Sequence, residues 1–379
     1  MISGVSAGLS KIVTRQPLPI PVVFLRELCE NKQAMYTPKY SISNKILKNI
    51  GITEAAREVI MNAPLVPAWE KKFRDEAILR TVHYGTHIEG NELNFTEAAQ
   101  VLEGKEIVGR DRDIQEVINY RQVLRFIDSF TGEIAAETIK TMHKLTTEKI
   151  LEAGECGQFR TKQVVVRNSQ TQEVVFRPPP ALEVPYQVDD FIEWLRQEKE
   201  IHPVLKAGVT HYELVRIHPF LDGNGRVARA VATLVLFKEG YDIKKFFSLE
   251  EHYDQDASRY YTALQSVKPE ENYDLTDWLD YFTEGLAIEL ARIKEKVQSL
   301  SIDLKLKEKI GGTQIALSER EMKIIDYIQK VGFLQNKQFA ELLPMISEDT
   351  ILRDLKDLLN KGIIKKEGTT KAARYILKG

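Results

Sequence analysis

Residues 218–229 read HPFLDGNGRVAR, and an apolar stretch follows them through Phe237. A Gly-Asn-Gly turn stands in the middle of this segment, and Arg226 and Arg229 come directly after it. Glycines before a helix leave its free backbone N–H groups open to an anion. Two guanidinium groups on a first helical turn oppose the helix dipole, so an anion between them makes their placement favourable. The segment therefore predicts a phosphate-binding site at a helix N-terminus.

The residues before the glycines add the remaining chemistry. His218 has an imidazole that can accept a proton from an attacking hydroxyl near neutral pH. Asp222 is a carboxylate that can hold Mg²⁺ beside phosphate oxygens. Phe220 lies between them, and we expect it to anchor the loop in the core. Together these parts indicate transfer of a phosphorus group. The competing interpretation is a core histidine beside an ordinary turn.

Outward from this segment, the N-terminal half has mostly a helical pattern. Residues 1–45 contain four prolines and no sustained period, and they predict an extended arm or loops laid on the body of the protein. Residues 53–89 have helical spacing that stops at Gly90. Asp113–Phe130 is predicted to be an amphipathic helix.

The helical pattern breaks between residues 160 and 180. Two β-branched runs, TKQVVVRN and TQEVVFRP, are joined by Asn168-Ser169-Gln170, which indicates a β-hairpin. Three prolines from Pro178 end the second run. Helices are predicted to resume near Val184 and to continue to about Lys309.

The C-terminal residues 317–379 have the pattern of a winged helix, with three short helices and a two-stranded wing around Gly368. The predicted helices are Ser318–Lys330, with a capping box, Asn336–Leu343 and Ser347–Lys361. The third helix has three basic and four acidic residues, whereas the wing has five basic residues and one acidic residue. Because phosphate contacts need cationic surface, DNA is a less favoured partner for this segment than protein.

The whole composition describes an ordinary globular chain of 379 residues. Lys and Arg number 53 and Asp and Glu 55, so bulk charge does not favour nucleic acid or an anionic membrane. Two cysteines are too few for a disulfide scaffold. No apolar run approaches the roughly 20 residues that span a bilayer, and the N-terminus lacks the layout of a secretory signal. We therefore expect a cytoplasmic protein.

The segment HPFLDGNGRVAR resembles the HxFx(D/E)GNGRxxR signature of the Fic (Fido) family, with every defined position present. The preceding HYELVRI is similar to the family's lead-in helix, and residues 50–285 fit its layout. The resemblance implies a mainly α fold, in which a Fic helical core carries a β-hairpin flap and a winged helix follows. The implied division is residues 1–110 as an N-terminal region with an inhibitory helix, 111–290 as the Fic core, 291–316 as a linker helix and 317–379 as the winged helix.

The same resemblance implies transfer of AMP from Mg-ATP to a Ser, Thr or Tyr hydroxyl of a target protein or of the chain itself. His218 would deprotonate that hydroxyl, and Asp222 would coordinate Mg²⁺. The hairpin looks like a flap that clamps a target segment by strand addition. The implied nucleotide-binding residues are Gly223, Asn224, Gly225, Arg226, Val227, Ala228, Arg229 and Tyr260, and the implied flap residues are Gln163, Val164, Val165 and Val166.

The segment THIEGN, residues 86–91, resembles the family's inhibitory motif (S/T)xxxE(G/N). Glu89 would pair with Arg229 and displace the γ-phosphate of ATP from its productive place. The sequence departs from the motif four residues before the glutamate, where it has Gly85, and its hydroxyl residue is Thr86. An ordinary polar helix end is the alternative interpretation of Glu89.

Two other functions remain open at this point. One is a hydrolase of the same fold that removes AMP from a modified protein. The other is a nucleotide-sensing regulator that binds DNA through residues 317–379. The motif does not fix the nucleotide, and the sequence is compatible with a homo-oligomer. His83 and His87 have the HxxxH spacing of a zinc helix, but Tyr84 stands where such a helix has its glutamate, so we expect both to pack near the site.

Overall fold

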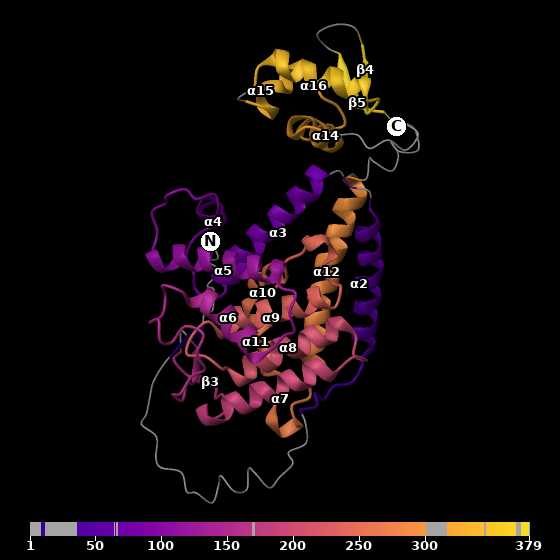
Figure 1. Ribbon diagram of the computed structural model, residues 1–379. Helices are drawn as coiled ribbons and strands as arrows, with labels where there is room; N and C mark the ends of the chain where they lie inside the picture. The colour runs from indigo at the N-terminus through magenta and orange to yellow at the C-terminus, as the bar shows by residue number, and fades with distance from the viewer. Residues whose placement is uncertain are drawn as a thin grey trace, which may run out of the picture. The chain divides into compact units, whose positions relative to one another are not determined.

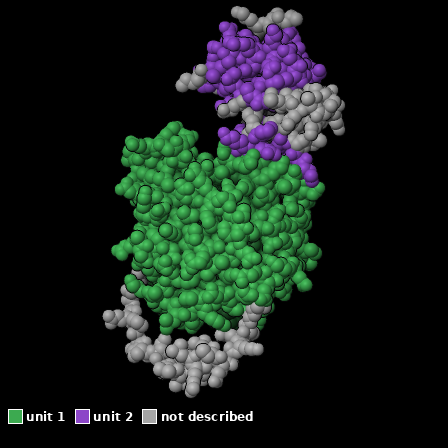
Figure 2. All heavy atoms as spheres, viewed as in Figure 1, with its two compact units in different colours: residues 1–61, 74–294 green, residues 62–73, 295–379 purple. Residues whose placement is uncertain are grey.

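The computed structural model describes residues 9–11, 36–63, 65, 67–168, 171–300, 317–344, 346–368 and 373–378. This part of the chain is mostly helical with two small sheets, which confirms the predicted fold class (Figure 1). It divides into two compact units, residues 1–61 with 74–294 and residues 62–73 with 295–379 (Figure 2). The finer four-part division stays a prediction.

The larger unit holds most of the helices, and α8 and α9 lie side by side within it (Figure 1). Along the chain its elements are β1 (Leu9–Lys11), α2 (Asn44–Asn62), α3 (Pro67–His87, which begins in the smaller unit), α4 (Phe95–Leu102), α5 (Asp111–Ser129), α6 (Ala136–Thr147), β2 (Val166–Asn168), β3 (Val174–Phe176), α7 (Val184–Gln197), α8 (Pro203–Ile217), α9 (Asn224–Lys238), α10 (Leu249–Gln255), α11 (Ala257–Gln265) and α12 (Thr276–Leu300, which ends in the smaller unit), with 3-10 turns at Ala181–Glu183, Ile243–Lys245 and Pro269–Glu271.

The core of this unit forms around α8, whose side chains are almost all buried. Close packing depends on Gly208, because a Cβ there would lie 2.7 Å from Leu279 of α12. Trp278 of α12 is fully buried and donates its indole N–H to the carbonyl of Gly208 at 2.8 Å. α8, which leads into the HPFLDGNGRVAR segment, is therefore packed closely against α12 at Gly208.

The helical pattern of residues 53–89 belongs to two helices. The first, α2, already begins at Asn44, and the second, α3, begins at Pro67. Prolines at positions 64 and 67 explain the division, since proline disfavours helix before itself and fits the first helical turn. The turn after α3 contains Gly90 at φ +95°, a left-handed conformation that glycine adopts without strain.

The predicted hairpin is present but much shorter than its two runs. Val166 pairs with Phe176 and Arg167 with Val174, with a register shift between them. Continuing the ladder past Val166 would bring prolines opposite, and proline has no N–H to donate. The side chain of Gln163 donates to the carbonyl of Pro178 instead, at 3.0 Å.

A third strand joins this sheet from the N-terminal end of the chain. β1 pairs antiparallel with β2, in the order β1-β2-β3, with Leu9 opposite Asn168 and Lys11 opposite Val166. At residues 9–11 the predicted arm therefore lies on the body of the protein. Most of the remaining arm falls outside the described residues.

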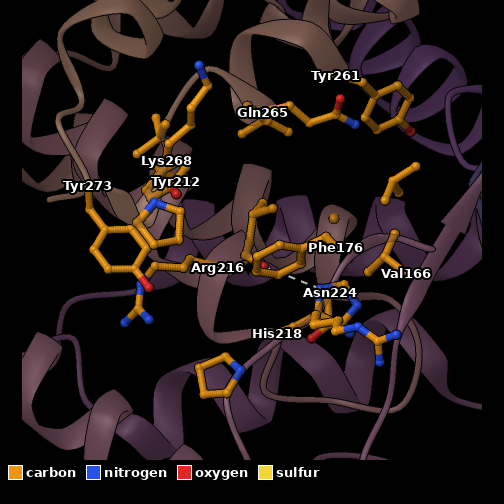
Figure 3. Close-up of a pocket in the computed structure, with 18 of the residues that line it drawn as sticks. Val166, Phe176, Tyr212, Arg216, His218, Asn224, Tyr261, Gln265, Lys268 and Tyr273 are labelled. Carbon is orange, nitrogen blue, oxygen red and sulfur yellow. Dashed lines mark hydrogen bonds between the residues drawn. The ribbon is translucent and has the colours of Figure 1, made fainter. Parts of the chain in front are cut away.

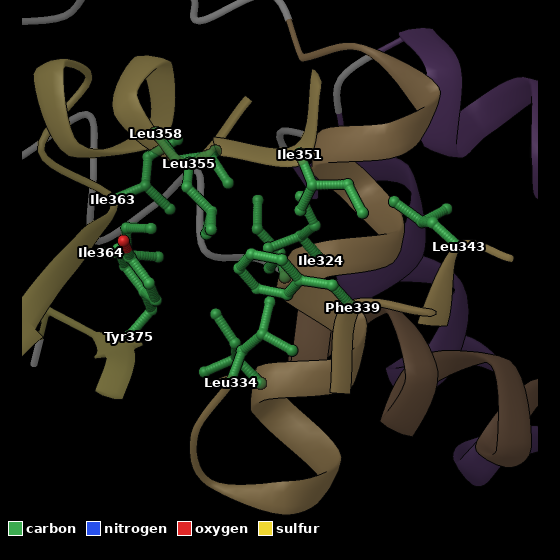
Figure 4. Packing of buried hydrophobic residues seen from close by; sticks show 12 residues of the cluster. Ile324, Leu334, Phe339, Leu343, Ile351, Leu355, Leu358, Ile363, Ile364 and Tyr375 are labelled. Atoms are coloured by element: carbon green, nitrogen blue, oxygen red, sulfur yellow. The ribbon is translucent and has the colours of Figure 1, made fainter. Parts of the chain in front are cut away.

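The smaller unit has the predicted winged-helix plan, with a hydrophobic core of its own (Figure 4). The Ser318–Glu321 capping box is present at its first helix. The predicted helix Asn336–Leu343 is instead a 3-10 turn followed by a single α-turn, and the proline at position 344 ends it. The elements are α14 (Glu319–Val331), a 3-10 turn at Asn336–Gln338, α15 (Phe339–Leu342), α16 (Glu348–Asn360), β4 (Ile364–Glu367) and β5 (Arg374–Leu377).

Among the described helices, none combines the length and the apolar character that a bilayer crossing requires.

Candidate functional site

The HPFLDGNGRVAR segment forms the connection between α8 and α9. His218 caps the C-terminus of α8 in the left-handed region, at φ +50° and ψ +59°, which is uncommon for a residue with a Cβ. Gly223 takes the same region at the N-terminus of α9. Asn224 braces the loop, since its Oδ1 accepts the N–H of Phe220 at 2.8 Å and its Nδ2 donates to the carbonyl of Phe220 at 2.9 Å. The N–H of His218 still donates to the carbonyl of Leu214 in α8, and the Phe220–Asn224 bonds close the loop that follows, so the backbone is held before and after the strained histidine.

His143, a buried histidine on α6, packs against this loop. The ring of His143 stacks on Phe220 with centroids 3.8 Å apart, and Phe220 is fully buried, as the sequence predicts. Nδ1 of His143 accepts the N–H of Gly157, so Nε2 is the nitrogen that donates to the carbonyl of Asp222 at 3.0 Å. One neutral imidazole thus links the approach to the hairpin with the loop that carries Asp222.

Arg160 joins the hairpin to the same loop. Its Nε donates to the carbonyl of His218 at 2.8 Å, and its Nη2 donates to the carbonyl of Pro179 at 2.6 Å. Burial lowers the pKa of Arg160 to about 10, which still leaves the guanidinium charged at pH 7. The hairpin and His218 are therefore held at a fixed separation.

A cavity of about 880 Å³ opens between the hairpin, the α8–α9 loop and α11, with His218 and Asn224 close together (Figure 3). That volume lies in the range of small-molecule sites. The cations in its wall are Arg177, Arg216, Arg229 and Lys268, and the carboxylates are Glu89 and Glu183. Behind the wall, Glu213 pairs with Arg216 and Glu271 with Lys268, so the balance of charge is close to even.

The structure brings some of the predicted site residues to this cavity and leaves others behind its wall. The residues that line it are Glu89, Val166, His218, Asn224, Gly225, Arg229 and Tyr260. The predicted residues outside the lining, within the described chain, are Gln163, Val164, Val165, Asp222, Gly223, Arg226, Val227 and Ala228. Of the four predicted flap residues, only Val166 belongs to a strand.

Glu89 lies against the predicted anion site. Its Oε1 is 2.9 Å from Nη2 of Arg229, and a Cβ added to Gly225 would lie 2.2 Å from the same oxygen. Arg229 is buried, and its Nη2 also donates to the carbonyl of Gly85 at 2.9 Å. Nε and Nη1 of Arg229 have no hydrogen-bond acceptor in the described structure. A buried guanidinium with N–H groups to spare fits a further anion.

Arg226 pairs with a different carboxylate. Its Nη1 is 3.0 Å from Oε1 of Glu116 on α5, and both side chains are almost fully buried. Glu116 also accepts from Nδ2 of Asn91 at 3.1 Å and from Nε of Arg112 at 3.1 Å. Arg112 in turn is 2.9 Å from Oδ2 of Asp222. Hydrogen bonds and ion pairs therefore connect Asn91, in the turn after Glu89, through Glu116 and Arg112 to Asp222, the predicted metal ligand.

The predicted tyrosine is fully buried at the side of the cavity. The hydroxyl of Tyr260 is 2.9 Å from Nε2 of His211, and burial raises the pKa of Tyr260 to about 12. The pKa of His211 is held well below its usual range, first by burial and then by the charge of Arg229. The hydroxyl of Tyr261 donates to the carbonyl of Ile88 at 3.4 Å, next to Glu89.

The hydroxyl of Thr86 turns into its own helix, where it donates to the carbonyls of Val82 and His83, each at 3.0 Å. It therefore does not meet Glu89. His83 and His87 lie with ring centroids 5.6 Å apart, and Nδ1 of His87 is 2.7 Å from Oδ1 of Asp254.

Sequence reasoning missed Glu116, Arg112 and His143. All three lie on helices whose sequence marks an amphipathic face but not the partner that the face meets. Glu116 stands among the residues of α5 that are buried. A carboxylate at such a position of an amphipathic helix indicates a cation on the facing element, because a buried charge needs a partner. Among the described residues no three His, Cys, Asp or Glu gather to hold a metal ion.

A strained histidine before a glycine turn, arginines on the next helix and a hairpin beside them define a Fic-type domain, here followed by a winged helix. Comparison with known families agrees. Residues 133–236 match the Fic/DOC family, and residues 320–369 match the DeoR-like helix-turn-helix domain. The chain therefore contains a Fic/DOC domain and a C-terminal helix-turn-helix domain.

Curated relatives include the protein adenylyltransferase fic-1 of Caenorhabditis elegans, 32% identical over 180 residues, which are 45% of this chain and 34% of the relative. The protein adenylyltransferase Fic of Drosophila willistoni is 28% identical over 221 residues, 57% of this chain and 42% of the relative. The chain thus spans between a third and a half of the length of these relatives.

Solved structures show the same fold. A Fic family protein from Desulfovibrio desulfuricans matches 91% of this chain and 99% of its own, with a TM-score of 0.60 and 21% identity. A fragment of Fic-1 from C. elegans matches 67% of this chain and 74% of its own, with a TM-score of 0.54 and 23% identity.

Proposed function

We propose that this chain transfers AMP from Mg-ATP to a Ser, Thr or Tyr hydroxyl of a target protein or of itself. One observation carries the proposal: His218, the N-terminus of α9 at Gly225 and the buried Arg229 meet in one cavity, and Nε and Nη1 of Arg229 have no acceptor in the described structure. The curated relatives that match are named protein adenylyltransferases, which supports the same reaction.

In this mechanism His218 accepts the proton of the target hydroxyl. The hydroxyl oxygen forms a bond to the α-phosphorus, and the bond from that phosphorus to the leaving pyrophosphate breaks. The backbone N–H groups of Asn224 and Gly225 at the N-terminus of α9 would hold phosphate oxygens with Arg226 and Arg229. The N–H of Val227 already donates to the carbonyl of Gly223 at 3.0 Å, so we assign Val227 and Ala228 only to the packing of that turn. Tyr260, in the cavity wall, would contact the nucleoside.

Asp222 fits a divalent cation because its carboxylate lies beside the glycine turn at the start of α9. Mg²⁺ there would supply neutralising charge to the phosphates and would take most of its remaining ligands from phosphate oxygens and water. Oδ2 of Asp222 now faces Arg112 at 2.9 Å, and Arg112 is half-exposed, so this side chain can move aside.

Glu89 would restrain the reaction. Its carboxylate takes one N–H group of Arg229 and lies against Gly225, where a phosphate would bind. A carboxylate and a terminal phosphate compete there by charge and by volume. The pairing is intramolecular, between the turn after α3 and the first turn of α9. Activity would require Glu89 to leave.

The hairpin at Gln163–Val166 would hold the target segment. Val166 lines the cavity and lies in β2, so an extended segment added to this strand would run beside His218. The helix-turn-helix unit would then serve protein contacts, with DNA as the less favoured partner.

The decisive experiment incubates the chain with ATP labelled on the α-phosphate and the proteins of a cell extract. We expect weak protein labelling by the natural chain, at least tenfold stronger labelling by Glu89→Gly, and none by Glu89→Gly with His218→Ala. Equal labelling by the single and double variants would contradict the proposal. Using α-labelled ATP, UTP and GTP in parallel tests the choice of nucleotide.

Two other readouts separate the remaining alternatives. Release of AMP from a modified protein, without labelling by any variant, would indicate the hydrolase. A salt-sensitive, sequence-dependent gel shift that survives His218→Ala would indicate the DNA-binding regulator.

A further inference from the structure

The outer edge of the hairpin is occupied by the chain itself. Residues 9–11 form β1 and pair antiparallel with β2, so that Ser10 lies opposite Arg167. β3 takes the other edge of β2. A strand has only two edges along which it can pair, and both edges of β2 are therefore filled over this length.

One end of β1 lies next to the cavity. Leu9 lies opposite Asn168, at the turn end of the hairpin, and Lys11 lies opposite Val166. Val166 lines the cavity that contains His218. The backbone of β1 therefore runs from the tip of the hairpin toward the site, along the edge that a target segment would use.

We propose that the N-terminal arm around Leu9–Lys11 is an internal occupant of the target-docking edge and competes with target proteins for it. This inference rests on the proposed function, because it assigns the edge of β2 to target binding. A tethered segment has a high effective concentration at its own site, so even weak pairing holds it against a free competitor. The arm is a second restraint, separate from Glu89: one limits the target and the other limits the nucleotide.

Cross-linking tests the occupancy without any measurement of activity. In a full-length chain with Cys29→Ser, we introduce Ser10→Cys and Arg167→Cys, whose Cα atoms face each other across the sheet. The remaining native cysteine, Cys156, is buried. The control pairs Ser10→Cys with Glu173→Cys, beside β3, about 10 Å away across two strand spacings and beyond disulfide reach.

Under oxidised glutathione we expect the first pair to form an intramolecular disulfide, with loss of two protons and two electrons to the oxidant. The control pair should stay reduced. Absence of the disulfide, or equal cross-linking of both pairs, would overturn the proposal. A disulfide-linked dimer would overturn its intramolecular form and assign the edge to the arm of a second copy.

Competition is tested in the same chain with Glu89→Gly added. We expect labelling of extract proteins to fall at least tenfold on oxidation and to return with a reductant. Ser10→Pro, which removes a strand N–H and disfavours pairing, should raise labelling at least twofold in the Glu89→Gly chain.

The outcomes separate the two levels of inference. Labelling that is unchanged by oxidation, although the disulfide has formed, would overturn competition while leaving the transferase intact. A disulfide without labelling in any reduced variant would support occupancy by the arm and contradict the proposed function.

Discussion

At Gly85 this chain departs from the inhibitory motif of the Fic family that residues 86–91 resemble, and the structure gives a physical reason. The motif has a hydroxyl residue there, but a Cβ at Gly85 would lie 2.5 Å from Cε1 of Tyr120 and 3.1 Å from Cγ of Glu250. Tyr120 is fully buried and donates to Glu250 at 3.2 Å, so it cannot move aside easily. The missing side chain also lets Arg229 reach the carbonyl of Gly85. Here the backbone, and not a hydroxyl, positions the arginine that Glu89 binds.

A Gly85→Ala substitution is therefore expected to destabilise the chain by about 1–3 kcal/mol through overpacking, despite the better helix propensity of alanine. Gly51→Ala is the matched control, because Gly51 is also in a helix and a Cβ there meets nothing within 4 Å. That control should be neutral or stabilising by up to about 1 kcal/mol. Urea unfolding of both variants measures the difference, and equal stabilities would contradict the tight approach to Tyr120.

Glu116 is a buried carboxylate with cationic partners. It is buried, pairs with Arg226 and Arg112, and accepts from Asn91. Glu116→Gln should lower the free energy of unfolding by about 3 kcal/mol, because it leaves the buried guanidinium of Arg226 with only the more distant carboxylate of Asp222, at 3.8 Å. Inorganic pyrophosphate should raise the melting temperature of this variant more than that of the natural chain, since an anion replaces the lost carboxylate.

Glu103→Gln provides the control for Glu116→Gln. Glu103 is an exposed carboxylate that lies 2.6 Å from Nζ of the equally exposed Lys105. It should change stability by less than about 0.5 kcal/mol and should leave the effect of pyrophosphate unaltered. A similar pyrophosphate response in both variants would show that Arg226 does not receive the anion.

At the scale of elements, α3 connects the turn that carries Glu89, the proposed restraint, to the rest of the larger unit. Its Arg80 contacts Glu251 of α10 at 2.7 Å and Glu289 of α12 at 2.6 Å. At its last turn, His87 pairs with Asp254 of α10. The Glu89 turn therefore begins from a helix end that charged contacts hold in place.

The His87–Asp254 contact gives this helix end a dependence on pH. The hydrogen bond with Asp254 raises the pKa of His87 above its usual value, about 6.5. The protonated form is thus favoured in the folded state, so the contact stabilises fully below about pH 6.5. It is lost as the pH rises through the raised value. His83, the other titratable group facing His87, has a pKa lowered mainly by burial and acts in the opposite direction.

His87→Gln is therefore expected to be less stable than the natural chain at pH 6 and nearly equal at pH 8. The side chain of His87 is 38% exposed, so solvent screening limits the difference to at most about 1 kcal/mol. His83 is present in both proteins and largely cancels. Urea unfolding at the two pH values measures the deficit, and a deficit that is constant or larger at pH 8 would contradict this assignment.

The elements also show what the sequence could and could not predict. The Ser318 cap and the core role of Phe220 follow from local patterns, and the structure has both. The hairpin is shorter than predicted because the prolines that end one run also stand opposite the other. Ion pairs between residues far apart in the sequence, such as Glu116 with Arg226, could not be predicted. The pattern of α5 shows which of its faces is buried, but it does not show which other helix packs against that face.

For the whole molecule, the helix-turn-helix unit depends on its own core and its own ion pairs. Asp354 of α16 is buried and binds Arg320 of α14 at 2.7 Å, and Lys361 binds Glu321 at 2.8 Å. Part of the acidic charge of the predicted recognition helix is thus neutralised within the unit. The wing lysine Lys366 lies over the ring of Tyr375. These contacts belong to the stability of the unit and need no partner.

Because the helix-turn-helix unit has its own hydrophobic core, we expect a substitution in that core to lower the stability of this unit alone. Leu355→Ala removes a fully buried side chain from the core of the smaller unit and should destabilise that unit by about 2–5 kcal/mol. Under the proposed function, Mg-ATP should raise the melting temperature of the larger unit. None of the described residues in the core of the smaller unit lines the cavity, so Leu355→Ala should leave that rise unchanged. Lys356→Ala, exposed on the same helix, is the control and should stay within about 0.5 kcal/mol. Scanning calorimetry with and without Mg-ATP measures both transitions, and a weaker Mg-ATP response in Leu355→Ala alone would show that the helix-turn-helix unit supports the nucleotide site.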